Sequence, residues 1–270
     1  MRCYYSTVSS FYVQNFGCRA TQADGAAIER QFEEQGMERA EAAAHAEIVV
    51  LNTCTVTSSA DQDARAAIRR VLRENPQAKI VVTGCYAQRA PEELAAIEGV
   101  SQVIGNSHKH ELARLAASRP IQTDPAFVSL ASLGTENREL RTDVHVSDIF
   151  AHTELIAAPV FDAPNERTRP NLKVQDGCDN RCSFCVIPFV RGQSRSMKLA
   201  QILDEVRTLV AAGYRELVIS GINLGRWGKD LEAGDRSQIT GSQVSGLRCQ
   251  ETPGVTTGTK PYPMPHRAKD

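Results

Sequence analysis

Three short segments in the first third of the chain each run directly into a cysteine. The second and third are β-branched and almost continuously apolar, which is typical of strands whose two faces are both covered. The segments occupy residues 11–17 before Cys18, 47–53 before Cys54, and 79–84 before Cys85. We interpret all three as β-strands.

The stretches between these strands repeat apolar residues at helical spacing. Thr21 is placed to cap a helix that carries Ile28 and Phe32 on one face and ends at Gly36. Either Ser58 or Ser59 precedes the next helix. Helices are predicted at residues 60–74, 91–99 and 111–118, with a fourth strand at residues 100–104. This alternation predicts an α/β domain with a parallel sheet.

The alternation also predicts where the three cysteines lie. In a parallel sheet the carboxyl ends of all strands share one edge, so Cys18, Cys54 and Cys85 should converge there. Three thiolates beside helix amino termini and turn amides suit an iron–sulfur site. A lone cysteine is more often a small buried hydrophobe, but the equivalent placement of all three in a repeat favours a ligand role.

A second group of cysteines has the tight spacing C-x3-C-x2-C, formed by Cys178, Cys182 and Cys185. One short loop can then hold three corners of a cubane cluster and leave the fourth iron open to substrate. A closed zinc site needs a fourth ligand, and no histidine stands within 25 residues of this loop. Cys3 and Cys249 lie in polar, unpatterned segments and are interpreted as unpaired thiols.

The second cysteine group lies within another run of strand and helix. A strand is predicted at residues 171–175, an amphipathic helix at 199–212 and a further strand at 216–219. The cysteines follow the carboxyl end of a strand, as active-site residues do in (β/α) barrels. Ser220 and Gly221 end the last strand, where the glycine either admits a ligand to the backbone or only forms a turn.

Composition narrows the class of protein. A chain of 270 residues has room for about two domains. Its formal net charge of −1 gives no overall field for a polyanion or an anionic membrane, so nucleic-acid binding would depend on local patches. The sequence has no apolar run long enough to span a bilayer and no secretory signal at its start, which predicts a cytoplasmic protein with no membrane partner.

The motifs around the cysteines resemble those of a known family. C-x3-C-x2-C with Phe184 before the last cysteine resembles the signature of radical S-adenosylmethionine (SAM) enzymes. The sequences N-F-G-C-R at 15–19, N-T-C-T-V-T at 52–57 with A-D at 60–61, and T-G-C-Y-A-Q at 83–88 resemble the methylthiotransferases more specifically. With R-G-x-S-R-S at 191–196, the chain is most similar to the branch that makes 2-methylthio-N6-threonylcarbamoyladenosine in tRNA.

The resemblance implies a fold, cofactors and partners. The fold would be α/β, with a flavodoxin- or Rossmann-like parallel sheet followed by the start of a radical SAM (β/α) barrel. Two 4Fe-4S clusters are implied, one on each group of three cysteines, and Phe184, Ser220 and Gly221 would lie near the adenosine of bound SAM. The implied partners are the anticodon stem-loop of tRNA and an electron donor such as a flavodoxin or ferredoxin. No side chain is assigned a catalytic role.

Other functions stay open from the sequence. Methylthio transfer to isopentenyladenosine in tRNA or to a ribosomal protein is one alternative, and a non-catalytic iron–sulfur or thiol-redox module is another. Of the basic residues, Arg191 and Arg195 are interpreted as RNA phosphate contacts. A solvated helix face is the favoured interpretation for the four arginines of the second predicted helix, Arg65, Arg69, Arg70 and Arg73.

The resemblance spans residues 11 to about 230 and suggests domain limits. We expect an N-terminal methylthiotransferase domain at residues 1–122, a connection at 123–167, an incomplete radical SAM domain at 168–230 and a divergent or disordered tail at 231–270. Two barrel strands are recognised after residue 170, against about six in a complete barrel. The chain is therefore expected to be a truncated form with at most weak affinity for SAM.

Overall fold

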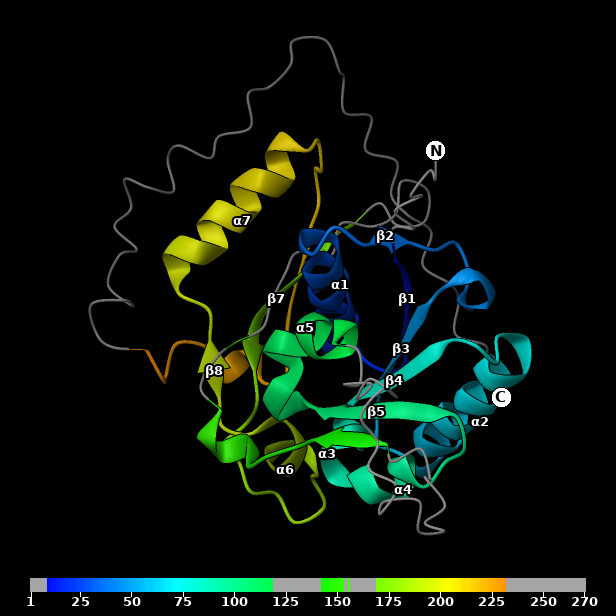
Figure 1. Ribbon diagram of the computed structural model, residues 1–270. Coiled ribbons are helices and arrows are strands. Elements are labelled where there is room, and N and C mark those ends of the chain that lie inside the picture. Colours follow the sequence, from blue (N-terminus) through cyan, green and yellow to red (C-terminus); the bar gives the residue numbers. More distant parts are fainter. Residues whose placement is uncertain (1–8, 119–141, 153–154, 156–168, 232–270) are drawn as a thin grey trace, which may run out of the picture.

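The computed structural model describes residues 9–118, 142–152, 155 and 169–231 (Figure 1). Within these ranges the first part of the chain forms a six-stranded sheet in the order β2-β1-β3-β4-β5-β6, and every neighbouring pair is parallel. The strands are β1 (Ser10–Asn15), β2 (Glu38–Arg39), β3 (Ile48–Thr53), β4 (Lys79–Gly84), β5 (Val100–Gly105) and β6 (Asp143–His145). The predicted parallel sheet is confirmed.

Helices cover both faces of this sheet, and the central strand β3 is buried along its whole length for that reason. Helices α2 (Ser58–Glu74) and α4 (Pro91–Ala95) pack on one face through Ile68, Val71 and Leu94. Helices α1 (Arg19–Glu34) and α5 (Leu112–Ala117) pack on the other. The shorter helical segments are α3 (Cys85–Arg89), η1 (Ala43–His45), η2 (Asn106–Glu111) and η5 (Ile149–Ala151).

The boundaries of α1 and α2 differ from those predicted. The N-cap of α1 is Cys18, without a side-chain cap hydrogen bond, so the prediction that Thr21 caps this helix is wrong. The hydroxyl of Thr21 instead lies 3.5 Å from the sulfur of Cys18. Helix α2 is capped by Thr57, whose Oγ1 accepts a hydrogen bond from the Ala60 amide at 3.1 Å, and not by either serine.

A second sheet has the order β8-β7-β9 among the described strands. Strand β7 (Asn171–Asp176) pairs parallel with β9 (Val218–Gly221) and antiparallel with β8 (Arg195–Ser196). The two predicted strands are confirmed, and Ser220 and Gly221 are the last residues of β9, as predicted. The helical segments here are α6 (Ile187–Arg191), the predicted helix α7 (Leu199–Ala211) and η6 (Leu224–Arg226).

The two sheets are joined through α1. Strand β7 is buried throughout, and the side-chain amide of Asn171 donates to the carbonyl of Arg19 at 3.0 Å. Leu172 and Val174 form a small core with Met197, against which Trp227 packs. The amino end of β7 is therefore held against the start of α1.

Several expectations fall on other parts of the chain. Cys3, Cys249 and almost all of the predicted tail at 231–270 lie outside the described residues. In the predicted connection, Asp143–His145 forms β6 and pairs with β5. No helix in the described part of the chain is long and apolar enough to cross a membrane.

Candidate metal centres

The first three cysteines lie at one edge of the six-stranded sheet. Cys18 follows the end of β1 and caps α1, Cys54 directly follows β3, and Cys85 is the first residue of α3 after β4. Because β1, β3 and β4 are neighbouring parallel strands, their carboxyl ends bring the three residues together. Cys54 is close enough to interact electrostatically with both of the others.

Glycines allow the backbone to come this close. Gly17 has φ +99°, and a Cβ placed there would lie 2.6 Å from Cβ and 2.9 Å from Sγ of Cys54. Gly84 has φ +101°, and its Cβ would lie 2.2 Å from the carbonyl oxygen of Thr53. Both conformations are unfavourable for any residue with a side chain. The two glycines therefore form a cradle that sets Cys18 and Cys85 beside Cys54.

The electrostatic environments of these thiols differ. Burial favours the neutral form of Cys18, but the hydrogen bond with Thr21 and the charge of Arg191 lower its pKa below the ordinary value. Burial raises the pKa of Cys54, and the neighbouring Cys85 and Cys18 add to that effect. A positive metal would remove the mutual repulsion of three thiolates at this edge.

The second cysteine loop joins β7 to α6. Cys178 is buried, and the side-chain amide of Asn223 donates to its sulfur at 3.6 Å. Cys182 is exposed and Cys185 is partly exposed, and the amide of Cys185 donates to the carbonyl of Cys182 at 3.1 Å. The loop thus presents its last two thiols outward while the first is anchored.

The three residues expected near SAM have contrasting surroundings. Phe184 is fully exposed. Ser220 is buried, and its hydroxyl has no hydrogen-bond partner among the described residues. The space above Gly221 is filled, because an added Cβ would lie 2.9 Å from Leu224 and 3.0 Å from Gln175. Ser220 therefore has a polar group to offer a ligand, whereas Gly221 approaches side chains of its own sheet.

The cysteines of each group lie near one another, but their sulfur atoms do not surround a common point. Among the described residues, no three histidine, cysteine or carboxylate side chains lie close enough together to hold a metal ion as they stand. The thiols of each group would have to turn toward one centre to bind a cluster. The donor chemistry and the glycine cradle fit such a group, and three soft thiolates suit iron–sulfur ligation.

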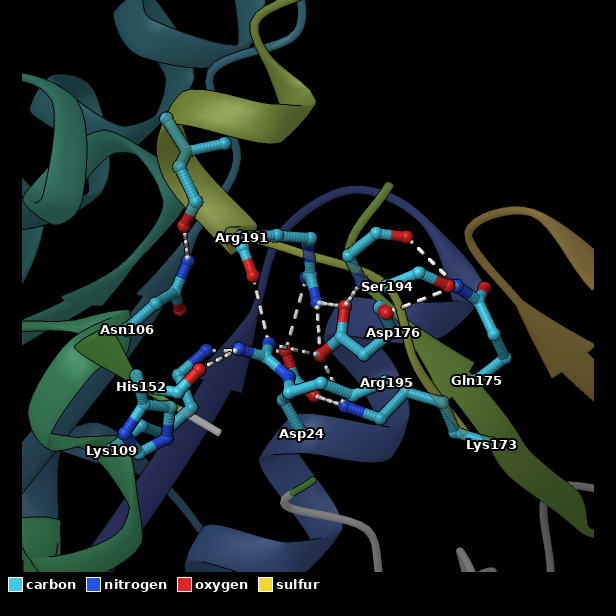
Figure 2. A network of polar contacts seen from close by, with 12 residues as sticks. Asp24, Asn106, Lys109, His152, Lys173, Gln175, Asp176, Arg191, Ser194 and Arg195 are labelled. Carbon is cyan, nitrogen blue, oxygen red and sulfur yellow. Dashed lines mark hydrogen bonds and ion pairs between the residues drawn. The ribbon is translucent and has the colours of Figure 1, made fainter. Parts of the chain in front are cut away.

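A buried network of charges that the sequence did not reveal lies near Cys18 and Cys85 and at the start of the second cysteine loop. Figure 2 shows the residues of this network. Asp24 on α1 accepts hydrogen bonds from Lys109 at 3.1 Å, from Arg191 at 3.0 Å and from Lys173. Asp176 at the end of β7 accepts from Arg191 at 2.9 and 3.1 Å and from Lys173 at 2.9 Å. The network therefore joins α1, η2, β7 and α6.

The carboxylates of this network are strongly held in the charged form. Burial alone would raise the pKa of Asp24, but Lys109, Lys173 and Arg191 lower it well below the ordinary value. Burial likewise opposes ionisation of Asp176, and Arg191 and Lys173 again lower its pKa well below the ordinary value. Burial lowers the pKa of Lys109, against the attraction of Asp24. Both aspartates are thus fixed anions within the protein.

This network corrects the interpretation of Arg191 as an RNA contact. Its side chain is 2% exposed and is committed to Asp176 and Asp24, so it cannot reach a phosphate at the surface. Arg195 is 11% exposed and donates to the carbonyl oxygens of His152 and Arg191. The signal in the sequence that could have pointed to such a network is Lys173, a charged residue in the middle of a predicted strand.

The arginines of α2 divide into two groups. Arg65 donates to the hydroxyl of Tyr86 at 2.5 Å and lies over its ring, with 5.8 Å from guanidinium to ring centre. Arg69, Arg70 and Arg73 are exposed. The expected solvated face therefore holds for these three, whereas Arg65 packs on Tyr86, the residue that follows Cys85.

Comparison with known proteins gives this arrangement a family context. Residues 10–105 match the model described as "Uncharacterized protein family UPF0004", and residues 172–225 match that of the Radical SAM superfamily. The first region contains Cys18, Cys54 and Cys85, and the second contains Cys178, Cys182 and Cys185. The molecule is thus an α/β protein in which a UPF0004 sheet is followed by the start of a radical SAM region.

Curated relatives make the family more specific. The chain is 36% identical over 219 residues to "Threonylcarbamoyladenosine tRNA methylthiotransferase MtaB" of Bacillus subtilis (strain 168), covering 80% of this chain and 44% of that protein. It is 38% identical over 219 residues to the protein of the same name from Aquifex aeolicus (strain VF5), covering 80% and 48%. The "tRNA-2-methylthio-N(6)-dimethylallyladenosine synthase" of Zymomonas mobilis subsp. mobilis (strain ATCC 31821 / ZM4 / CP4) is 33% identical over 238 residues, covering 86% and 47%.

These matches identify the family. The chain belongs to the methylthiotransferase family that joins a UPF0004 region to a radical SAM region. It spans about half the length of the curated relatives it matches.

Proposed function

We propose that the chain acts in a tRNA methylthiotransferase that makes 2-methylthio-N6-threonylcarbamoyladenosine next to the anticodon. The observation that carries the proposal is the placement of two groups of three cysteines after strand ends, with one buried ion network that contacts the elements next to both groups. The relatives from Bacillus subtilis and Aquifex aeolicus, which are named for this modification, support the choice of product.

Each cysteine group would hold one 4Fe-4S cluster. Cys18, Cys54 and Cys85 would ligate the first, in the cradle made by Gly17 and Gly84. The loop cysteines would ligate the second, with Asn223 donating to the sulfur of Cys178. When bound, the clusters and SAM supply the radical that removes a hydrogen atom from the adenine ring and the sulfur that takes its place.

The residues of the chain would position these groups and their ligand. The unpartnered hydroxyl of Ser220 and the exposed ring of Phe184 are proposed to contact SAM, with Gly221 beside them. The electron for SAM cleavage is proposed to come from a flavodoxin or ferredoxin. The exposed face near Phe184 would receive the anticodon stem-loop, and the buried side chain of Arg191 would not take part in that contact.

Mass spectrometry of tRNA nucleosides tests this proposal. The chain is reconstituted anaerobically with iron and sulfide and incubated with SAM, a reductant and tRNA that carries either threonylcarbamoyladenosine or isopentenyladenosine. At saturating SAM a low yield of the 2-methylthio form of the first nucleoside is expected, because the affinity of the chain for SAM is expected to be weak. The Bacillus subtilis relative is the positive control. The Zymomonas relative motivates the second substrate.

Two outcomes would contradict the proposal in different ways. Conversion of isopentenyladenosine alone would place the chain in the other tRNA branch. Full loading of both clusters without either nucleoside product would favour a non-catalytic iron–sulfur module.

A further inference from the structure

The buried ion network contains more cations than carboxylates. In the described part of the chain, the side chains of Lys109, Lys173 and Arg191 are at most 3% exposed, and they share Asp24 and Asp176 as partners. A buried charge without a counter-charge is costly, so the fold is expected to provide another negative group nearby. Arg195 at the rim adds to the excess of positive charge.

The cysteine edge of the six-stranded sheet is a source of that negative charge. Arg191 is close enough to interact electrostatically with Cys85 and Cys18, and Lys109 interacts with Cys85. An iron–sulfur cluster bound by three thiolates is an anion, and it takes up a further negative charge on reduction. Nearby cations therefore favour its reduced state.

Hydrogen bonds carry the network as far as the sulfur atoms. Arg191 Nη2 lies 3.4 Å from Thr21 Oγ1, which lies 3.5 Å from the sulfur of Cys18. Because the Thr21 oxygen accepts from Arg191, its own proton is available to the sulfur. The amide of Asn106 donates to the carbonyl of Val190 at 2.6 Å and lies 3.8 Å from the sulfur of Cys85.

On its other side, Arg191 holds the second cysteine loop. Its Nη1 donates to both carboxylate oxygens of Asp176, and the amide of Gly177 donates to one of them at 2.8 Å. The next amide, that of Cys178, donates to the carbonyl of Gly192 at 3.1 Å. One guanidinium therefore contacts both α1, which begins directly after Cys18, and the end of β7, which precedes Cys178.

We propose that Arg191 is a positioning residue that links the two centres and raises the reduction potential of the cluster on Cys18, Cys54 and Cys85. It acts through its charge and through Thr21, which passes its hydrogen bond to Cys18. This inference rests on the proposed function, because it requires the first cysteine group to bind a cluster.

The potential of that cluster alone is the quantity to measure. In the full chain, Cys178, Cys182 and Cys185 are replaced by alanine so that the first centre remains, and its potential is found by redox titration followed by electron paramagnetic resonance. In this background we compare Arg191→Gln, Arg191→Lys and Thr21→Val. The matched controls are Arg207→Gln and Thr208→Val on α7, because Arg207 and Thr208 are both exposed.

The expected results separate charge from simple packing. Arg191→Gln should shift the one-electron equilibrium toward the oxidised cluster at least tenfold, which is about 59 mV. Thr21→Val, which keeps every ion of the network, should shift it about threefold in the same direction. Arg191→Lys keeps the charge and should stay within twofold of the unsubstituted arginine, as should both controls.

Iron content distinguishes the two ways in which the inference could fail. A chain that binds no iron at its first centre would overturn the proposed cluster and this inference together. Full iron content with Arg191→Gln and Thr21→Val both within twofold of the parent would overturn the inference alone. If Arg191→Gln does not fold, Thr21→Val decides the matter by the same limits.

Discussion

Replacement of Asp24 by asparagine should weaken the attachment of the second sheet to the first. Asp24 is 2% exposed and has three cationic partners, of which Lys173 and Arg191 belong to the second half of the described chain. Asparagine keeps the size of the side chain and removes its charge. Of the carboxylates in the network, Asp176 would then remain alone with three buried cations.

The expected loss of stability follows from the burial of these groups. Removing one partner of a buried ion pair costs about 3–5 kcal/mol, and we expect the upper part of this range because three pairs are lost together. The matched control is Asp204→Asn on α7, where the side chain is 72% exposed and pairs with Arg207 at 2.8 Å. Such surface pairs contribute about 0–1 kcal/mol.

Urea unfolding measures the difference. With a slope of about 2 kcal/mol per molar urea, the midpoint should fall by about 2 M for Asp24→Asn and by less than about 0.5 M for the control. The only tryptophan, Trp227, packs on the core of the second sheet, so its fluorescence reports on that part of the chain. If Asp24→Asn lowers neither the fluorescence nor the circular dichroism midpoint more than Asp204→Asn does, the network is not a net source of stability.

Two further outcomes follow from the same geometry. Because the pKa values of Asp24 and Asp176 are lower in the folded chain, their contribution to stability should be complete above about pH 5 and decline as the pH falls through their folded pKa values. Urea midpoints measured between pH 7 and pH 3 should therefore fall more steeply for the natural chain than for Asp24→Asn, and equal slopes would contradict the assignment. Gly17→Ala adds about 1–3 kcal/mol of backbone strain and a steric contact with Cys54. The first of the two centres should then be lost, so the iron content after reconstitution should fall by about half. Cys178→Ala should cause an equal loss at the second centre. Gly36→Ala, with φ +76° and open space around it, carries the strain without the contact and should keep its iron, and equal losses in both glycine variants would refute the role of the cradle.

The sequence predicted the elements whose patterns are local and long. The buried strands before Cys54 and Cys85 are continuous apolar runs, and their parallel order follows from the helices between them. The prediction that Thr21 caps α1 was wrong. Threonine is a good capping residue, but the hydroxyl of Thr21 contacts Cys18 and Arg191 instead. Strands β2 and β8 have two residues each, which is too short for an alternating pattern of apolar and polar residues. They form because they pair with longer strands, which the sequence alone does not show.

The candidate site divides in the same way. The cysteine groups could be predicted because strand ends meet at one edge whatever the side chains around them. The ion network could not, because Asp24 meets Lys109, Lys173 and Arg191 across 85, 149 and 167 positions of chain. Arg191 illustrates the limit, since its motif suggested a surface contact with RNA and its burial shows a structural one.

The long separations around Asp24 also set an order of events during synthesis. Domains generally fold from the amino terminus as the chain emerges from the ribosome. Lys109 lies in η2, directly after β5, so Asp24 gains its first cation while β7 and α6 are still unmade. Lys173 and Arg191 arrive later and dock on a carboxylate that is already in place. The cysteine edge of the first sheet is therefore complete before the second cysteine loop is translated, and the nascent chain exposes its two cysteine groups one after the other.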